Sequence, residues 1–178
     1  MLEAVLIVAV ILAIAIIAVL AYAATRPDTF SVQRSTTIRA PAEKIFPFIN
    51  DFHAWTAWSP YETRDPDMKR IYGGALSGKG ATYAWDGNRN VGAGRMEILD
   101  APAPSRVTIK LDFSRPFEGH NTAEFTLEPQ GDATKVTWAM HGPALFVGKL
   151  MGLFIDMDKM IGKDFEAGLA NLKVSAEK

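Results

Sequence analysis

The chain has 178 residues, which suggests one ordinary domain with an attached segment. Its 19 basic and 20 acidic residues give a net charge of -1, so no global field attracts nucleic acid. Cysteine is absent, which excludes disulfides, thiolate metal sites and cysteine nucleophiles, and the three histidines form no metal-binding pattern. We therefore expect no metal, no cofactor and no nucleic-acid partner.

The first segment is an apolar run over residues 4–24 that contains no charge. At about 1.5 Å per residue the run spans roughly 32 Å, enough to cross a hydrocarbon core of about 30 Å. A cleaved secretory signal is the alternative, because Ala21, Tyr22 and Ala23 fit an A-x-A cleavage site. We favour a retained membrane anchor over residues 1–25, since a signal's apolar core is usually only about 7–15 residues long and no Lys or Arg precedes this run.

The basic residues closest to this run follow it in the sequence. They are Arg26, Arg34, Arg39 and Lys44. Positive charge tends to stay on the cytoplasmic side, so this pattern slightly favours a single-pass protein with a cytoplasmic domain.

After a linker over residues 26–29, we expect one domain over residues 30–178. Residues 29–38 alternate loosely and predict a strand, and Pro41 suits the first turn of a helix over 42–49. Trp55 and Trp58 are spaced for one helical turn, which we expect Pro60 to stop.

Six more strands are predicted, separated by turns rich in Gly, Asn and Pro. They cover residues 68–73, 80–86, 91–100, 105–114, 119–129 and 133–141. Several alternate clearly; Val107, Ile109 and Leu111, for example, are interleaved with polar residues. One apolar and one polar face are typical of an antiparallel sheet that is covered on one side.

The C-terminal segment predicts a single long helix over residues 145–174. Its apolar residues recur at steps of three and four and would share one face. They are Leu150, Phe154, Met157, Ile161, Phe165, Leu169 and Leu172. The start of this helix is apolar on more than one face, which indicates either a buried helix start, the interpretation we favour, or a surface that touches the bilayer.

Several blocks of the sequence resemble one known superfamily. The segments are 36–46 (TTIRAPAEKIF), 55–60 (WTAWSP), 92–96 (GAGRM), 134–138 (TKVTW) and 162–169 (GKDFEAGL). They are similar to polyketide cyclase/dehydrase-type proteins of the START/Bet v 1-like (SRPBCC) superfamily. The resemblance covers about residues 30–175 and implies an α+β helix-grip fold, in which a seven-stranded antiparallel sheet curls around a C-terminal helix with a cavity between them.

We predict that this cavity is lined by apolar residues on the inward phase of the strands and helices. They are Trp58, Tyr61, Tyr83, Trp85, Met96, Ile98, Ile109, Leu111, Phe113, Phe125, Trp138, Met140, Phe154, Met157 and Phe165. The alternative for each one is that it simply fills the core. Gly148, Gly152, Gly162 and Gly168 would cost about 1 kcal/mol each in a helix, which indicates either close backbone approach or room beside the helix.

Few polar residues fall on the predicted inward phase. Tyr61, Tyr83 and His141 are weak candidates for acid–base chemistry, and no suitable pair is evident. We therefore favour membrane-anchored binding of a hydrophobic small molecule, a lipid or polyketide-like compound. The alternatives are a cyclase- or dehydrase-like enzyme that uses the same cavity, and a non-catalytic, membrane-tethered protein-interaction module.

Overall fold

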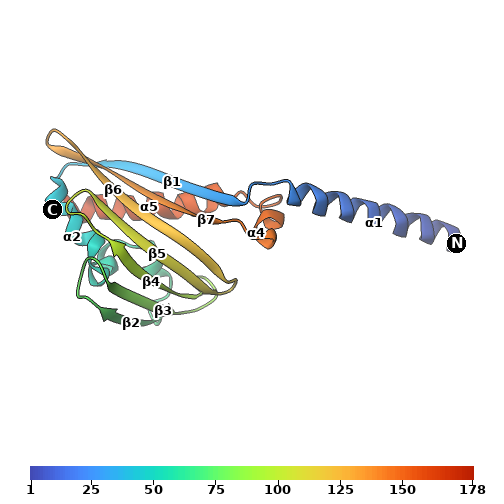
Figure 1. Ribbon diagram of the computed structural model, residues 1–178, viewed down its shortest axis with the longest axis horizontal. Helices are drawn as coiled ribbons and strands as arrows, with labels where there is room; N and C mark the ends of the chain where they lie inside the picture. Colours follow the sequence, from blue (N-terminus) through green and yellow to red (C-terminus); the bar gives the residue numbers. More distant parts are fainter.

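The computed structural model describes residues 1–178 and confirms an α+β domain behind an N-terminal helix (Figure 1). The helices are α1 (Leu2–Ala24), α2 (Ala42–Asn50), the 3-10 helix η1 (Phe52–Ala57), α3 (Pro60–Arg64), α4 (Phe146–Met151) and α5 (Met157–Ala176). The strands are β1 (Thr29–Ile38), β2 (Lys69–Gly74), β3 (Ala81–Asp86), β4 (Ala93–Asp100), β5 (Arg106–Arg115), β6 (Gly119–Gln130) and β7 (Ala133–Pro143).

The strands form one seven-stranded antiparallel sheet in the order β1-β7-β6-β5-β4-β3-β2. This confirms the predicted sheet. Side chains alternate between the two faces of a strand, so the register aligns the buried residues of neighbouring strands on one face. Phe125 of β6 lies opposite Trp138 of β7, for example, and Ile98 of β4 lies opposite Ile109 of β5. We call this apolar face, which is turned toward α5, the inner face of the sheet.

The C-terminal half of α5 closes the inner face. Phe165, Leu169 and Leu172 are at most 2% exposed and belong to one core that also includes side chains of α2, η1 and the strands. Burying a large apolar side chain contributes about 1.5–3 kcal/mol, so this half of α5 holds the domain together.

The predicted single helix over residues 145–174 is wrong, because the chain turns between α4 and α5. Gly152 caps α4, and the Asp156 side chain accepts a hydrogen bond from the Lys159 backbone N–H over 2.9 Å. Asp156 is therefore an N-cap that starts a new helix. The predicted helix crossed this turn because Phe154 fits the three-and-four spacing of the apolar residues. In the structure, however, the Phe154 side chain is 78% exposed.

The turn at the two tryptophans also differs from the prediction. Trp55 lies in η1 as expected, but Pro60 begins α3 instead of ending the helical segment. A proline is well tolerated at the first position of a helix, because its missing N–H would have no partner there. The prediction thus missed α3, which follows η1 in the chain and contacts η1 and α5.

Two of the four C-terminal glycines are explained by close approach. A Cβ on Gly162 would collide with the Arg34 guanidinium, and a Cβ on Gly168 would lie 2.8 Å from the Trp138 ring. Gly148, in contrast, faces open space, and Gly152 ends α4.

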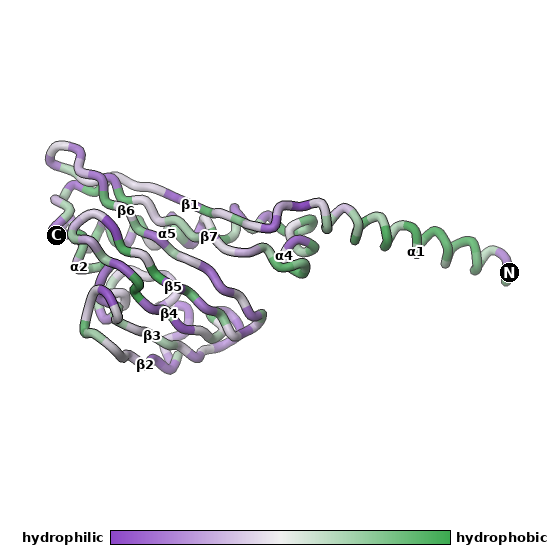
Figure 2. The backbone as a smooth tube through the Cα atoms, viewed as in Figure 1, coloured by the Kyte–Doolittle hydropathy of each residue, from purple (hydrophilic) through white to green (hydrophobic).

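α1 is one continuous apolar helix that projects from one end of the domain (Figures 1 and 2). It is long and apolar enough to span a membrane, and a signal sequence has the same properties. We refer below to the end of the domain next to α1 as its α1 end.

Candidate functional site

The inner face brings most of the predicted cavity residues together. Those that are buried on it or against it are Trp58, Tyr83, Met96, Ile98, Ile109, Leu111, Phe125, Trp138, Met140 and Phe165. Tyr61, Trp85 and Phe113 are partly buried against the same core. Met157, at the start of α5, is half-buried, whereas Phe154 lies in the turn before α5 and points to solvent, so it does not line the inner face.

Stacked aromatic rings fill the space between the sheet and the middle of α5. The Trp138 and Phe165 rings lie 4.1 Å apart between centroids and 10° from parallel. Phe125 also stacks with Trp138, with centroids 5.0 Å apart, and Trp58 meets Trp138 edge-on at 5.6 Å. This part of the inner face is packed core, as the alternative interpretation held for each residue.

One polar atom in this cluster has no partner. The indole Nε1–H of Trp138 is buried and donates to no acceptor in the protein. The two neighbouring indoles differ, because Trp55 donates to the Ile49 carbonyl over 3.0 Å and Trp58 to the Phe48 carbonyl over 2.8 Å. Leaving a buried donor unpaired costs about 1–3 kcal/mol, so such a group calls for an acceptor from a water or a ligand.

The α1 end of the inner face is covered less completely. The apolar side chains of Phe30, Trp85 and Phe113 are only partly buried there, as is Ile161 on the N-terminal half of α5. Asn121 adds a half-buried amide to the same face. An apolar surface with a few polar groups is typical of sites that bind small apolar molecules.

Sequence reasoning missed a polar cluster on the β2–β3 side of the inner face. The side chain of Glu62 on α3 is 6% exposed and accepts hydrogen bonds from Tyr83 Oη over 2.7 Å and from Arg70 Nε over 2.6 Å. Burial and the bond to Glu62 raise the pKa of Tyr83 well above its usual range. Glu62 could not be placed from the sequence because the helix that carries it was not predicted.

A second polar cluster joins α3 to α5. Arg64 forms an ion pair with Asp164, and burial followed by the negative charge of Asp164 raises the pKa of Tyr61 well above its usual range. Tyr61 and Tyr83 therefore stay protonated at neutral pH, and neither is suited to act as a general base.

The third candidate, His141, lies outside this region. It is exposed, and its register partners Ser31 and Thr122 place it on the outer face of the sheet. The three candidate residues are thus not brought together.

An arginine on the inner face clamps the N-terminal half of α5. Arg34 of β1 donates from Nε to Glu166 over 2.8 Å and from Nη2 to Asp158 over 2.9 Å, on either side of Gly162. Asp158, Gly162 and Glu166 are spaced by four residues and share one helix face. The clamp and the Arg64–Asp164 pair hold this half of α5 to β1 and α3.

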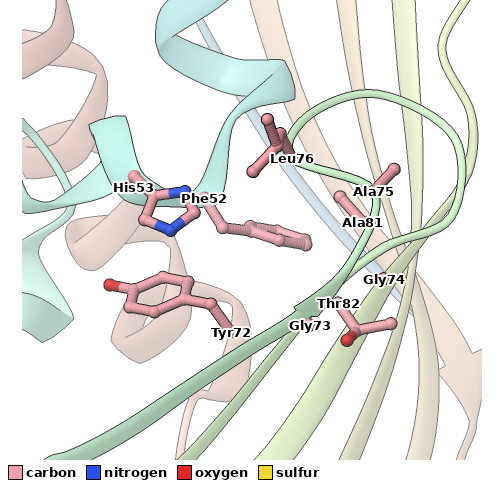
Figure 3. Close-up of a pocket in the computed structure, with 9 residues that line it drawn as sticks. All are labelled: Phe52, His53, Tyr72, Gly73, Gly74, Ala75, Leu76, Ala81 and Thr82. Carbon is pink, nitrogen blue, oxygen red and sulfur yellow. The ribbon is translucent and has the colours of Figure 1, made fainter.

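The surface carries a small hollow away from these groups. It has a volume of about 290 Å³ and lies between η1 and the β2–β3 turn (Figure 3). The His53 and Tyr72 rings stack on its wall with centroids 4.1 Å apart, and Leu76 lies at its rim. Its size is at the lower limit of typical ligand pockets, and no charged group is aimed into it.

Comparison with known proteins gives the family. The family model described as polyketide cyclase / dehydrase and lipid transport matches residues 29–177, and the chain belongs to this family. Among curated proteins, none matches the sequence.

Solved structures show the same Bet v 1-like fold. Ginseng major latex-like protein 151 from Panax ginseng is 11% identical with a TM-score of 0.61, and the match covers 85% of this chain and 100% of that one. Protein CV1439 from Chromobacterium violaceum is 14% identical with a TM-score of 0.59, over 86% and 99% of the two chains. Protein MLL2253 from Mesorhizobium loti is 16% identical with a TM-score of 0.58, over 82% and 98%.

Proposed function

We propose that the chain is a membrane-anchored domain that binds a hydrophobic small molecule, a lipid or a polyketide-like compound. In this proposal residues 1–25 are a retained anchor, residues 26–29 a linker and residues 30–178 the binding domain. The ligand lies between the inner face of the sheet and the N-terminal half of α5.

One observation carries the proposal, namely the incomplete cover over an apolar inner face at the α1 end. Phe30, Trp85 and Phe113 together with Ile161 leave apolar surface that a ligand would remove from water. The family and the fold support the same class of ligand. The unpaired Trp138 N–H adds one hydrogen-bond donor, so a ligand with a hydroxyl, carbonyl or ester oxygen fits better than a pure hydrocarbon.

The test is native mass spectrometry on the full chain, purified in detergent micelles or lipid nanodiscs. We expect an apolar molecule to co-purify in a defined ratio. Ala123 is buried on the inner face, and Ala139 faces outward beside it in the register. Ala123→Leu should therefore reduce the bound fraction, and Ala139→Leu should leave it unchanged. No bound molecule in the wild type, or equal retention in both variants, would contradict the proposal.

A further inference from the structure

The segment around α4 exposes a group of large apolar side chains. Leu145, Phe146 and Val147 are 54%, 46% and 52% exposed, and in the turn after α4 Phe154 and Ile155 are 78% and 41% exposed. We call these five residues the apolar lip. The interpretation of this segment as a buried helix start is therefore wrong. Large apolar side chains that are exposed together on one short segment indicate a contact with another apolar surface.

The apolar lip lies beside the end of α1. α4 packs against α1, and Ala23 in the last turn of α1 is fully buried (Figure 1). Val19 and Leu20 are 38% and 40% exposed, whereas Leu12, two turns earlier, is 57% exposed. In Figure 2 green apolar segments are present both along α1 and in α4, which lies beside the domain end of α1.

Polar contacts fix α4 at this position. The Asp28 carbonyl accepts a hydrogen bond from the Ala144 N–H over 2.8 Å, and the Asp28 carboxylate pairs with Lys149, whose side chain is only 9% exposed. Only four residues separate α1 from β1, a span of at most about 14 Å. The domain therefore cannot carry α4 away from the end of α1 without breaking these contacts.

The length of α1 determines how deep in the bilayer the α1 end of the domain lies. Its 23 residues extend over about 34 Å, slightly more than a hydrocarbon core of about 30 Å, so its last turn lies where acyl chains meet headgroups. A short helix with apolar side chains at that depth has the character of an interfacial helix. This position of the last turn of α1 rests on the proposed function, in which residues 1–25 are a retained membrane anchor.

We infer that the apolar lip lies in the membrane–water interface, in contact with the lipids around α1. The chain then has two attachments to one bilayer, a spanning helix and an interfacial lip. The partly covered end of the inner face opens beside this lip, so a ligand passes between the site and the bilayer without crossing water. The ligand class is thereby narrowed to membrane-resident amphiphiles.

The absence of cysteine permits a direct test, because a single introduced thiol labels one position of the full chain. Phe154→Cys and Val147→Cys carry an environment-sensitive fluorophore on the lip. Leu76→Cys is the control, since Leu76 is an 85% exposed apolar residue in the β2–β3 turn, at the end of the domain away from α1 (Figure 1). All three proteins are reconstituted in phosphatidylcholine nanodiscs.

We expect a blue-shifted emission at positions 147 and 154 and severalfold stronger quenching by lipids that carry a nitroxide near the headgroup than at position 76. Spectra at 147 and 154 that match position 76 would overturn the inference. Disulfide-linked dimers of the unlabelled Phe154→Cys protein in lipid would overturn it too, because a second copy would then cover the lip. The probe reports lipid contact and not ligand retention, so this result is independent of the mass-spectrometric test.

Discussion

At the scale of single residues, a substitution of Trp138 tests whether this buried side chain contacts a ligand or only fills the core. Its N–H is buried without an acceptor, whereas the N–H of Trp55 bonds to the Ile49 carbonyl. Trp138→Phe keeps an aromatic ring but removes the donor, and we expect about tenfold weaker ligand retention, equivalent to about 1.4 kcal/mol. The measurement is the bound fraction in native mass spectra across a ligand titration.

Trp55→Phe is the matched control for this prediction. It also removes an indole N–H, but one that the protein satisfies internally, so it should lower the free energy of unfolding without a comparable loss of ligand retention. Equal ligand retention in Trp138→Phe and the wild type would show that no ligand atom accepts from this donor.

Removing the Tyr83 hydroxyl tests whether this group stabilises the fold. Tyr83→Phe removes the hydroxyl that donates to the buried Glu62, so we expect the free energy of unfolding to fall by about 1–2 kcal/mol. Arg70 still pairs with the carboxylate, and the fold should persist. Urea denaturation followed by tryptophan fluorescence measures the change. A variant of unchanged stability would argue that the Tyr83–Glu62 bond contributes little.

The polar part of the site shows where sequence reasoning stops. Strand alternation placed the apolar inner face well, because side-chain period and burial are local properties. The pairing of Glu62 with Arg70 and Tyr83 joins α3 to two strands, and that contact depends on tertiary structure. Arg34 sits on an edge strand and reaches α5 with its guanidinium, a contact that local sequence patterns do not predict.

At the scale of elements, the glycines of α4 and α5 give a graded prediction. Replacing a helical glycine by alanine gains up to about 1 kcal/mol in helix propensity. Gly148→Ala should realise part of this gain, because its Cβ would meet open space. Gly168→Ala should instead lower the free energy of unfolding by about 1–3 kcal/mol, because its Cβ would press on the Trp138 ring and Pro60.

Gly162→Ala should fall between these two variants. Its Cβ would displace the flexible end of Arg34, so the cost is the weakening of the Arg34 ion pairs with Asp158 and Glu166, set against the gain in helix propensity. Thermal unfolding of the three variants in detergent micelles tests the order. A Gly168→Ala variant as stable as the wild type would mean that there is room beside α5.

The arginine clamp also predicts a pH dependence. Hydrogen bonding to Arg34 lowers the pKa of Asp158 below its usual value. The folded state therefore binds this proton less readily than the unfolded state. The stabilising contribution is complete above the ordinary carboxyl range near pH 4 and is lost as the pH falls through the folded-state pKa.

We accordingly expect Asp158→Asn to flatten the acid limb of the stability curve. Denaturation midpoints measured from about pH 5 down to pH 2 should change less steeply in this variant than in the wild type. The exposed Asp132, in the turn between β6 and β7, provides the control, and Asp132→Asn should retain the wild-type slope. Identical slopes in all three proteins would remove the clamp as a source of acid sensitivity.

The elements themselves were largely predictable, with instructive exceptions. Each strand of the sheet was placed within two residues, because alternation and Gly- or Pro-rich turns are strong local signals. The C-terminal segment was wrongly predicted as one helix, because the regular spacing of its apolar residues continues through Gly152 and Asp156. Both residues favour helix ends and mark the break between α4 and α5. Capping residues should therefore be weighed together with periodicity.

At the scale of the whole molecule, the partly covered inner face, the apolar lip and α1 all lie at one end. The opposite end is closed by the buried C-terminal half of α5, and the aromatic cluster lies between the two ends, against the middle of α5. The ion pairs of Arg34 with Asp158 and of Arg64 with Asp164 tie the N-terminal half of α5 to β1 and α3. A ligand that enters from the bilayer would loosen this half of the helix first, while the closed end keeps the fold intact.

The orientation of the chain in the membrane is the remaining whole-molecule prediction. Arg26 follows α1 directly and Lys149 is held against Asp28, whereas Glu3 is the only charged side chain before the apolar run. Arg34 and Arg39 belong to the folded domain, where they contact α5 or its C-terminal end, so they weigh less than their sequence positions suggested. Even so, more positive charge follows α1 than precedes it, and this asymmetry favours a cytoplasmic domain.

Leu76→Cys in the full chain tests this orientation, because the side chain is exposed and no other thiol is present. In intact cells we expect no reaction with a membrane-impermeant maleimide, and full reaction after lysis. A second variant adds Arg26→Glu and three lysines before residue 4, which should move the positive charge to the other side and make position 76 reactive in intact cells. Labelling of the first variant in intact cells would place the domain outside. Recovery of a chain that begins near residue 24 would show instead that α1 is removed.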